Sequence, residues 1–304
     1  MARAVTGPTH PVFRRSLFVA DKPQGPTSHQ VSAWVRDLVG AERAGHAGTL
    51  DPRVTGVLPI AFNEATRALD AMLAGDKEYV GVLELHQDVP DARVREMFRR
   101  FTGRVYQTPP VRSAVKREMR VRTIYEFDLL ERGGRLVLFR TRCESGTYIR
   151  TLANDLGEAL GVGAHLADLR RTRAGPFTEA HAHPLIDLQD ALSFWREDGD
   201  EAALRALVLP MERMLDHLPK IVVKDTAVDA ICHGADLAVP GVASMNPSVK
   251  KDDLVAIFTA KGEGVALAHA LLTSSQVDSA KKGVVADTKR VLMEPGTYPK
   301  GWKS

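Results

Sequence analysis

The order of strand-like and helix-like segments is the feature that most constrains the fold of this chain. Runs rich in β-forming residues predict strands at 16–22 and 78–86, with a further apolar run at 57–62. Helical spacing of apolar residues predicts helices at 28–39, 65–75, 92–103 and 146–161. Two further strand-like runs flank Gly133–Gly134 and predict a β-hairpin. Because the strands and helices do not alternate strictly, we predict an α+β fold on a mixed, largely antiparallel sheet.

Turn and capping residues predict where these helices begin and end. Ser28 is the predicted N-cap of the first helix, and Gly40 stops it. Gly75 ends the second helix. Thr147 is the predicted cap of the helix over 146–161, whose regularly spaced leucines face inward.

The pattern changes again in the last third of the chain. Residues 187–217 are helical and acidic, and after Pro219 short β-rich runs alternate with Gly, Pro and Asp. This predicts a small, mostly β domain of about eighty residues. The chain of 304 residues therefore has a predicted domain at 16–217 and another at 218–304, with residues 1–15 packing against the latter.

Basic residues are concentrated in one stretch, although the whole chain carries only +3 charges. Residues 93–122 hold ten arginines and lysines against two acids, Glu96 and Glu118. Such a cluster favours a polyanion partner, with a solvated charged face as the alternative. A second basic run, LRRTR at 169–173, supports nucleic acid as that partner.

Membrane and secretory classes are not supported by the composition. No segment approaches the ~18 apolar residues of a membrane span, and the N-terminus has no apolar signal-peptide core. Cys143 and Cys232 lie far apart and match no metal-ligand spacing, so we expect reduced thiols, a cytoplasmic protein and no metal.

A single acid, Asp51, lies in the turn-rich loop HAGTLDPRVTG at residues 46–56. An aspartate beside proline is most often an Asx-turn element. The functional alternative is a nucleophile or general base that a stiff backbone holds in place. Gly48 and Gly56 would let a substrate backbone approach closely.

Tyr79 and Arg150 are the next candidates. Tyr79 is either a core residue of its strand or a ring that stacks on a base. Arg150 begins a predicted helix, where the helix dipole disfavours a cation. It is therefore either an ordinary surface arginine or the partner of a carboxylate such as Asp51.

Six ordered motifs resemble the TruB-type pseudouridine synthases over residues 16–180. They are DKPQGPTS, HAGTLDPRVTGVLPI, KEYV, PPVRSAVKREMRVRTIYE, SGTYIR and GVGAHLADLRRTRAGPF. The segments HGADLAVPG and MEPGTYPKGW resemble a PUA domain, an RNA-binding β-barrel. Within the family, the chain is similar to the archaeal catalytic subunit of the H/ACA ribonucleoprotein, a relative of dyskerin. Lys116 is followed almost at once by REMRVRTIYE, where the bacterial enzyme has a long insertion that grips RNA, and the basic wording KREMRVRTIYE is itself typical of the guide-dependent branch.

The resemblance implies conversion of uridine to pseudouridine in ribosomal, and alternatively transfer, RNA under the direction of an H/ACA guide RNA. It implies no cofactor, and accessory proteins of the particle as partners. Two other readings stay open: a stand-alone transfer-RNA enzyme and a non-catalytic RNA-binding scaffold.

The resemblance also implies roles for individual residues. Asp51 is the catalytic aspartate, acting on the base or on the ribose, with Arg150 as its partner and Tyr79 stacking on the everted uracil. Leu169, Lys22 and His46 belong to the substrate-binding surroundings, and the motif of Lys22 buttresses the loop. The predicted RNA-phosphate contacts are Arg112, Lys116, Arg117, Arg120 and Arg122.

Overall fold

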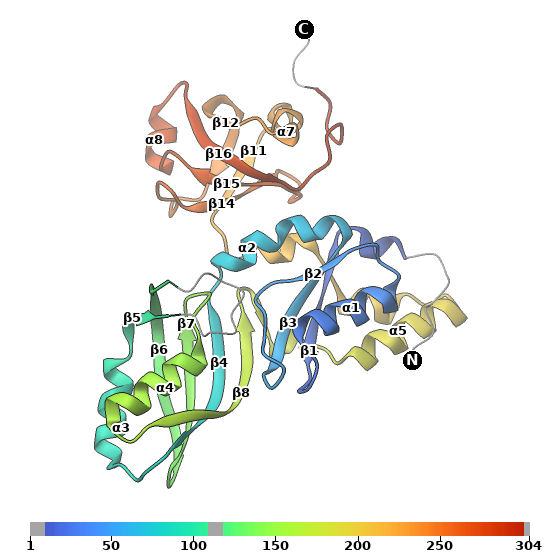
Figure 1. The fold of residues 1–304 in the computed structure, drawn as a ribbon. Coiled ribbons are helices and arrows are strands. Elements are labelled where there is room, and N and C mark those ends of the chain that lie inside the picture. Colours follow the sequence, from blue (N-terminus) through green and yellow to red (C-terminus); the bar gives the residue numbers. More distant parts are fainter. Residues whose placement is uncertain (1–9, 109–117, 301–304) are drawn as a thin grey trace.

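The computed structural model describes residues 10–108 and 118–300, which form two β-sheets with helices packed on them (Figure 1). The larger sheet has ten strands in the order β10-β1-β3-β8-β4-β7-β6-β5, with β2 beside β3 and β9 beside β8. Its strands are β1 (Ser16–Lys22), β2 (Ala44–His46), β3 (Thr55–Phe62), β4 (Lys77–Leu85), β5 (Gly103–Gln107), β6 (Arg120–Gly133), β7 (Leu136–Cys143), β8 (Ala164–Ala174), β9 (Phe177–Thr178) and β10 (Val208–Pro210). Among the described strands of this larger sheet, only β3 and β8 pair in parallel, so the predicted mixed, largely antiparallel sheet is confirmed.

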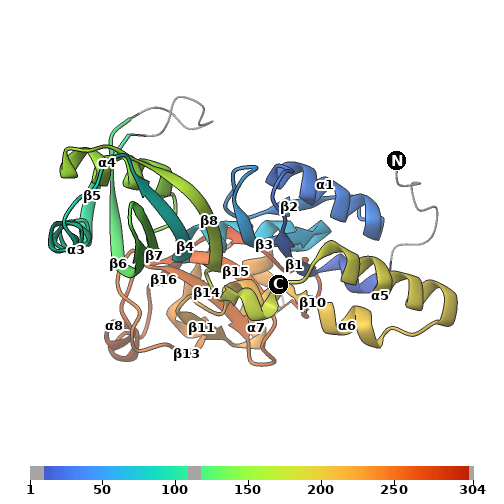
Figure 2. The same ribbon diagram turned by 90° about the horizontal axis from the view of Figure 1, so that it is seen from below.

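Helices cover the larger sheet in two groups, as Figure 2 shows. The helices α3 and α4 pack on the half that contains β4, β6 and β7, and α1 and α5 pack on the half that contains β1 and β3. The helices of the described chain are α1 (Ser28–Val39), α2 (Leu69–Ala74), α3 (Asp91–Arg100), α4 (Ile149–Leu160), α5 (Leu185–Asp198), α6 (Ala202–Leu207), α7 (Asp225–Cys232) and α8 (Ser274–Ser279).

The smaller sheet confirms the predicted mostly β region after Pro219. Its six strands follow the order β12-β16-β15-β14-β11-β13 and enclose an apolar core of their own. They are β11 (Lys220–Val223), β12 (Leu237–Ala238), β13 (Val242–Met245), β14 (Leu254–Thr259), β15 (Gly264–Ala270) and β16 (Val284–Val291).

The two sheets are joined by a shared core. One cluster of buried side chains combines Leu17 and Met72 from the first part of the chain with Phe258, Leu267 and Leu292 from the last. In Figure 1 the smaller sheet, coloured orange to red, lies directly above α2, where this cluster forms.

The N-terminal segment contacts both parts of the molecule. Phe13 is fully buried in the cluster beneath α1 and α5. Arg14 forms an ion pair with Glu294, and Arg15 donates a hydrogen bond to the carbonyl of Gly264.

Two predicted helix caps were wrong, because both side chains serve other groups. Thr27 caps α1 in a capping box with Gln30, while the hydroxyl of the predicted cap Ser28 binds the backbone of Leu50. Helix α4 begins at Ile149, and the hydroxyl of Thr147 donates to the carbonyl of Glu144.

One segment has a different secondary structure from the one predicted, and the basic run has its place in the larger sheet. The expected helix over 65–75 is a 3-10 helix, Asn63–Ala68, followed by the short α2. The basic run at 169–173 lies in strand β8, which joins β3 to β4 in the middle of the sheet.

Within the described ranges, 10–108 and 118–300, no helix has the length and apolar character needed to cross a membrane.

Candidate active site

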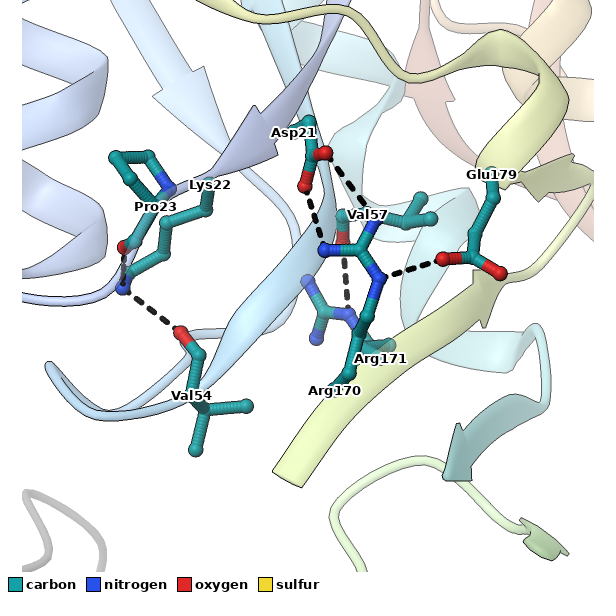
Figure 3. Close-up of polar contacts among 8 residues, drawn as sticks. All are labelled: Asp21, Lys22, Pro23, Val54, Val57, Arg170, Arg171 and Glu179. Carbon is teal, nitrogen blue, oxygen red and sulfur yellow. Dashed lines mark hydrogen bonds and ion pairs between the residues drawn. The ribbon is translucent and has the colours of Figure 1, made fainter. Parts of the chain in front are cut away.

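The loop that carries Asp51 runs from β2 to β3 and is held by buried donors beneath it. Lys22, at the end of β1, is fully buried and donates to three carbonyls: Pro23 at 2.9 Å, Pro52 at 3.2 Å and Val54 at 2.9 Å. Figure 3 shows Lys22 reaching Pro23 and Val54. Burial lowers the pKa of this ammonium, and nearby Asp51 opposes that shift. Lys22 therefore fixes the loop backbone from below.

Ser28 holds the middle of the same loop. Its hydroxyl accepts a hydrogen bond from the Leu50 N–H at 2.8 Å and donates to the Leu50 carbonyl at 3.0 Å. The backbone N–H of Gly25 donates to the Pro52 carbonyl at 2.8 Å. The backbone N–H and the carbonyl of Leu50, the residue before Asp51, are thus both hydrogen-bonded to the Ser28 hydroxyl. That part of the loop therefore has little conformational freedom.

Arg171 of β8 fastens the two arms of the loop, and our residue-by-residue reading of the sequence missed it. Its Nε donates to the Val57 carbonyl and its Nη1 to the Gly48 carbonyl, each at 2.8 Å. The side chain is 1% exposed, so it does not form an open basic surface. A signal was present: Arg171 lies in the middle of a strand-like run, two residues from Leu169.

Asp51 and Arg150 form an ion pair on the surface of the loop. Nη2 of Arg150, in the first turn of α4, contacts Oδ2 of Asp51. The side chains are 54% and 62% exposed, respectively, so a macromolecule can reach both. Water weakens such a pair, and an RNA that covered it would strengthen the attraction by lowering the local dielectric.

Tyr79 of β4 packs beneath the same loop. Its ring is 8% exposed and shares an apolar cluster with Leu50 and Val54, which lie on either side of Asp51. Leu169 of β8 belongs to the same cluster and is 7% exposed. Burial raises the pKa of the Tyr79 hydroxyl, and the Arg171 guanidinium partly offsets this rise.

His46 lies at the start of the loop, beside a hollow of about 400 Å³ between α1 and β2. Its Nδ1 is 3.0 Å from the Ser32 hydroxyl, and its ring meets His29 edge-on. Burial, with smaller contributions from His29 and Arg171, lowers the pKa of His46 to about 4. The ring is therefore neutral near pH 7.

Most of the predicted RNA-phosphate contacts fall outside the described residues, and the other two lie in β6. The three outside them are Arg112, Lys116 and Arg117. Arg120 is half-buried at the start of β6. Arg122 is engaged with Glu144 at 3.1 Å.

The basic run LRRTR, whose charge supports a nucleic-acid partner, has two arginines that bind other groups of the protein. Arg170 is bound to Asp21 and Glu179, as Figure 3 shows, and remains 37% exposed. Arg171 is buried. The two side chains face opposite sides of the sheet, because successive residues of a strand do.

Among residues 10–108 and 118–300, no group of three or more His, Cys, Asp or Glu side chains is arranged to hold a metal ion. Cys143 and Cys232 are both free and buried, and burial raises the pKa of Cys143 to about 12.

Three protein-family models match successive parts of the chain. The TruB family pseudouridylate synthase N-terminal domain matches residues 36–149, and the tRNA pseudouridylate synthase B C-terminal domain matches residues 150–216. The PUA domain matches residues 219–292.

Archaeal relatives are similar over almost the whole chain. A probable tRNA pseudouridine synthase B of Methanopyrus kandleri is 54% identical over 97% of this chain and 87% of its own length. The protein of the same name from Archaeoglobus fulgidus is 52% identical, over 98% and 91%.

Solved structures agree in fold. A Cbf5-Nop10-Gar1 complex contains a chain of 47% identity with a TM-score of 0.91, covering 98% of this chain and 94% of that one. An H/ACA ribonucleoprotein bound to a substrate RNA containing 2'-deoxyuridine gives 45% identity and a TM-score of 0.88, over 99% and 95%. With this sheet order, this clamped aspartate loop and relatives above 50% identity, the chain belongs to the TruB family of pseudouridine synthases.

Proposed function

We propose that this chain isomerises uridine to pseudouridine with Asp51 as the catalytic carboxylate, at RNA sites selected by an H/ACA guide RNA. The observation that carries the proposal is the exposed Asp51–Arg150 pair on a loop whose backbone is clamped by Lys22, Ser28 and Arg171. An acid held in this way needs little reorganisation when substrate arrives.

The proposed reaction changes two bonds and moves two protons. The bond from ribose C1' to N1 breaks, a bond from C1' to C5 forms, the proton on C5 leaves and N1 gains a proton. Asp51 acts as the anion, on the base or the ribose, and Arg150 holds its carboxylate in place. Tyr79 contacts the everted uracil and takes part in removing the C5 proton.

The surrounding residues have supporting roles in this proposal. Leu169 contacts or shields the uracil, and His46 contacts RNA beside the loop. Lys22 positions the loop instead of contacting substrate, because its three donors are all occupied by carbonyls. Arg120 belongs to the RNA-phosphate surface, and Arg112, Lys116 and Arg117 are proposed to extend it.

Guide dependence is supported by two similar structures of H/ACA complexes, whose matching chains are covered almost from end to end. By that likeness the partners are a guide RNA, a substrate RNA and accessory proteins like Nop10 and Gar1. The proposed domains are 16–217 for catalysis and 218–304 for RNA binding, in a cytoplasmic particle. The names of the archaeal relatives favour a second candidate, a transfer-RNA synthase that acts without a guide.

Reconstitution of the particle distinguishes guide-dependent activity from guide-free activity on transfer RNA. The chain is incubated with C5-tritiated ribosomal substrate RNA with and without guide RNA and accessory proteins, and with tritiated transfer RNA alone, while tritium release is followed. Release from the ribosomal substrate only with guide supports guidance. Release from transfer RNA alone at an equal rate supports the second candidate.

Asp51→Asn is expected to lower tritium release by about a thousandfold or more while RNA affinity stays within about threefold, since the amide neither attacks nor accepts a proton. Asp70→Asn is the matched control. Asp70 is also 54% exposed and paired with an arginine, Arg290, but lies in α2. Wild-type release by Asp51→Asn would refute the proposed role.

A further inference from the structure

Arg171 is a buried cation without an acidic partner. It is 1% exposed, and no carboxylate of the described residues lies within ion-pair distance of it. Its hydrogen bonds go to two neutral carbonyls. Burying a guanidinium without a carboxylate partner costs free energy, because the charge loses its hydration. A hydrophobic residue would fill the space at lower cost, so the placement calls for a reason beyond packing.

The two bonded nitrogens of Arg171 span the loop of Asp51. Gly48 precedes the aspartate and Val57 follows it, and the guanidinium binds the carbonyls of both. The backbone also comes close here. A Cβ on Gly48 would lie 3.1 Å from Nη1 of Arg171, and a Cβ on Gly56 would lie 2.2 Å from the Arg171 carbonyl oxygen. A single planar group therefore fixes the separation of the two loop arms.

The other proposed catalytic side chain, Tyr79, is the cross-strand neighbour of Arg171. Arg171 and Tyr79 are paired across β8 and β4, so both side chains stand on the same face of the sheet. Nη2 is buried, and no hydrogen-bond partner of good geometry lies around it in the described part of the chain. The Tyr79 hydroxyl is nevertheless close enough that each group shifts the pKa of the other.

We propose that Arg171 is a positioning residue, which holds the Asp51 loop and the Tyr79 hydroxyl at one set separation. The inference rests on the proposed roles of Asp51 and Tyr79. It adds that their spacing is set by one rigid fork. A misplacement of about 1 Å would cost about a hundredfold in rate, so such a brace has a measurable effect.

Arg170 provides a matched control on the same strand. It points to the opposite face of β8 and is bound to Asp21 and Glu179 at 2.5–3.1 Å. Loss of either arginine removes several hydrogen bonds from the centre of the sheet, so a purely structural contribution would appear in both variants.

The first test needs no RNA and no turnover. With 3-fluorotyrosine in place of tyrosine, the ¹⁹F signal of position 79, assigned from Tyr79→Phe, is followed during a pH titration. Arg171→Met should raise the midpoint for position 79 by about one pH unit, because the stabilising cation is lost. Arg170→Met should leave it in place. An unchanged midpoint in Arg171→Met, or an equal rise in both variants, overturns the inference even if Asp51 proves catalytic.

The second test uses Arg171→Lys, which keeps the charge and removes the fork, and so serves also if Arg171→Met does not fold. At saturating RNA in the reconstituted particle, single-turnover tritium release should fall by about a hundredfold, with RNA affinity within about threefold of wild type. Arg170→Lys should change release by less than about threefold. In a Tyr79→Phe background the loss from Arg171→Lys should shrink severalfold, because the two residues act together. A wild-type rate for Arg171→Lys, or an equal loss in both backgrounds, overturns the inference.

Discussion

At the scale of single residues, three buried cations surround the base of the Asp51 loop. Lys22 and Arg171 bind carbonyls of the loop, and Lys77 binds the carbonyls of Met72 and Gly75 at the end of α2. Burial lowers the pKa of Lys77 to about 8. Cations in these positions satisfy carbonyls that the turns leave without partners.

His46 gives a pH-dependent prediction at this scale. Its pKa is lowered to about 4 from the ordinary 6.5, so between these pH values the unfolded chain binds a proton that the folded chain does not. The free energy of unfolding therefore falls as pH drops through this window. His46→Gln cannot take up this proton, so its melting temperature should fall less than that of wild type between pH 7 and pH 5. His269→Gln, on the smaller sheet, is the control, and an equal fall in wild type and His46→Gln would contradict the prediction.

At the scale of elements, β8 organises the site. It pairs in parallel with β3 through Gly56 and antiparallel with β4 through Tyr79. The position of the loop that precedes β3 and the position of the Tyr79 ring on β4 therefore both depend on β8. The first turn of α4, which carries Arg150, packs into the same apolar cluster as Leu169 of β8. Strand β8 thus contacts the elements that carry Asp51, Tyr79 and Arg150.

Gly56→Ala tests the closeness of β3 and β8. Gly56 has φ 102°, and an added Cβ would lie 2.2 Å from the Arg171 carbonyl oxygen. We expect a loss of about 3 kcal/mol or more in the free energy of unfolding, from backbone strain and overlap combined. Gly262→Ala supplies strain alone, because Gly262 has φ 84° with no atom within 4 Å of the added Cβ, and should lose about 1 kcal/mol. Equal losses, measured by chemical denaturation, would contradict the proposed backbone contact.

At the scale of the whole molecule, the two sheets share a hydrophobic core and are not loosely tethered. The shared cluster reaches from Leu17 of β1 to Leu292 beyond β16. The ion pair between Asp70 and Arg290 lies across the same junction. Because apolar burial is the main stabilising contribution, the smaller sheet should add stability to the larger sheet.

Leu292→Ala tests this coupling. Leu292 is fully buried in the shared cluster, and its truncation should cost about 2–5 kcal/mol. Amide exchange should then quicken in β1 and β3 as well as in the smaller sheet. Ile257→Ala is the control, since Ile257 is equally buried but lies in the separate core of the smaller sheet. If Leu292→Ala left exchange in β1 and β3 unchanged, the two sheets would be independent.

The sequence alone determined the local elements and the residues that carry the family motifs. Periodic apolar spacing predicted β1, β4, α1, α3 and the hairpin at Gly133, because these patterns depend on neighbours within a few residues. The motifs also pointed to Asp51 and Arg150 as partners. The same reasoning chose wrongly at Ser28, whose hydroxyl binds Leu50, 22 positions away, and at Thr147, whose hydroxyl binds Glu144.

Only the tertiary structure decided how donors and acceptors are shared. Asp51 and Arg150 are 99 positions apart, and Arg171 is 123 positions from the Gly48 carbonyl that it binds. Such pairings depend on the order and register of the strands. These are set by burial of the whole sheet, a non-local quantity that no short stretch of sequence contains.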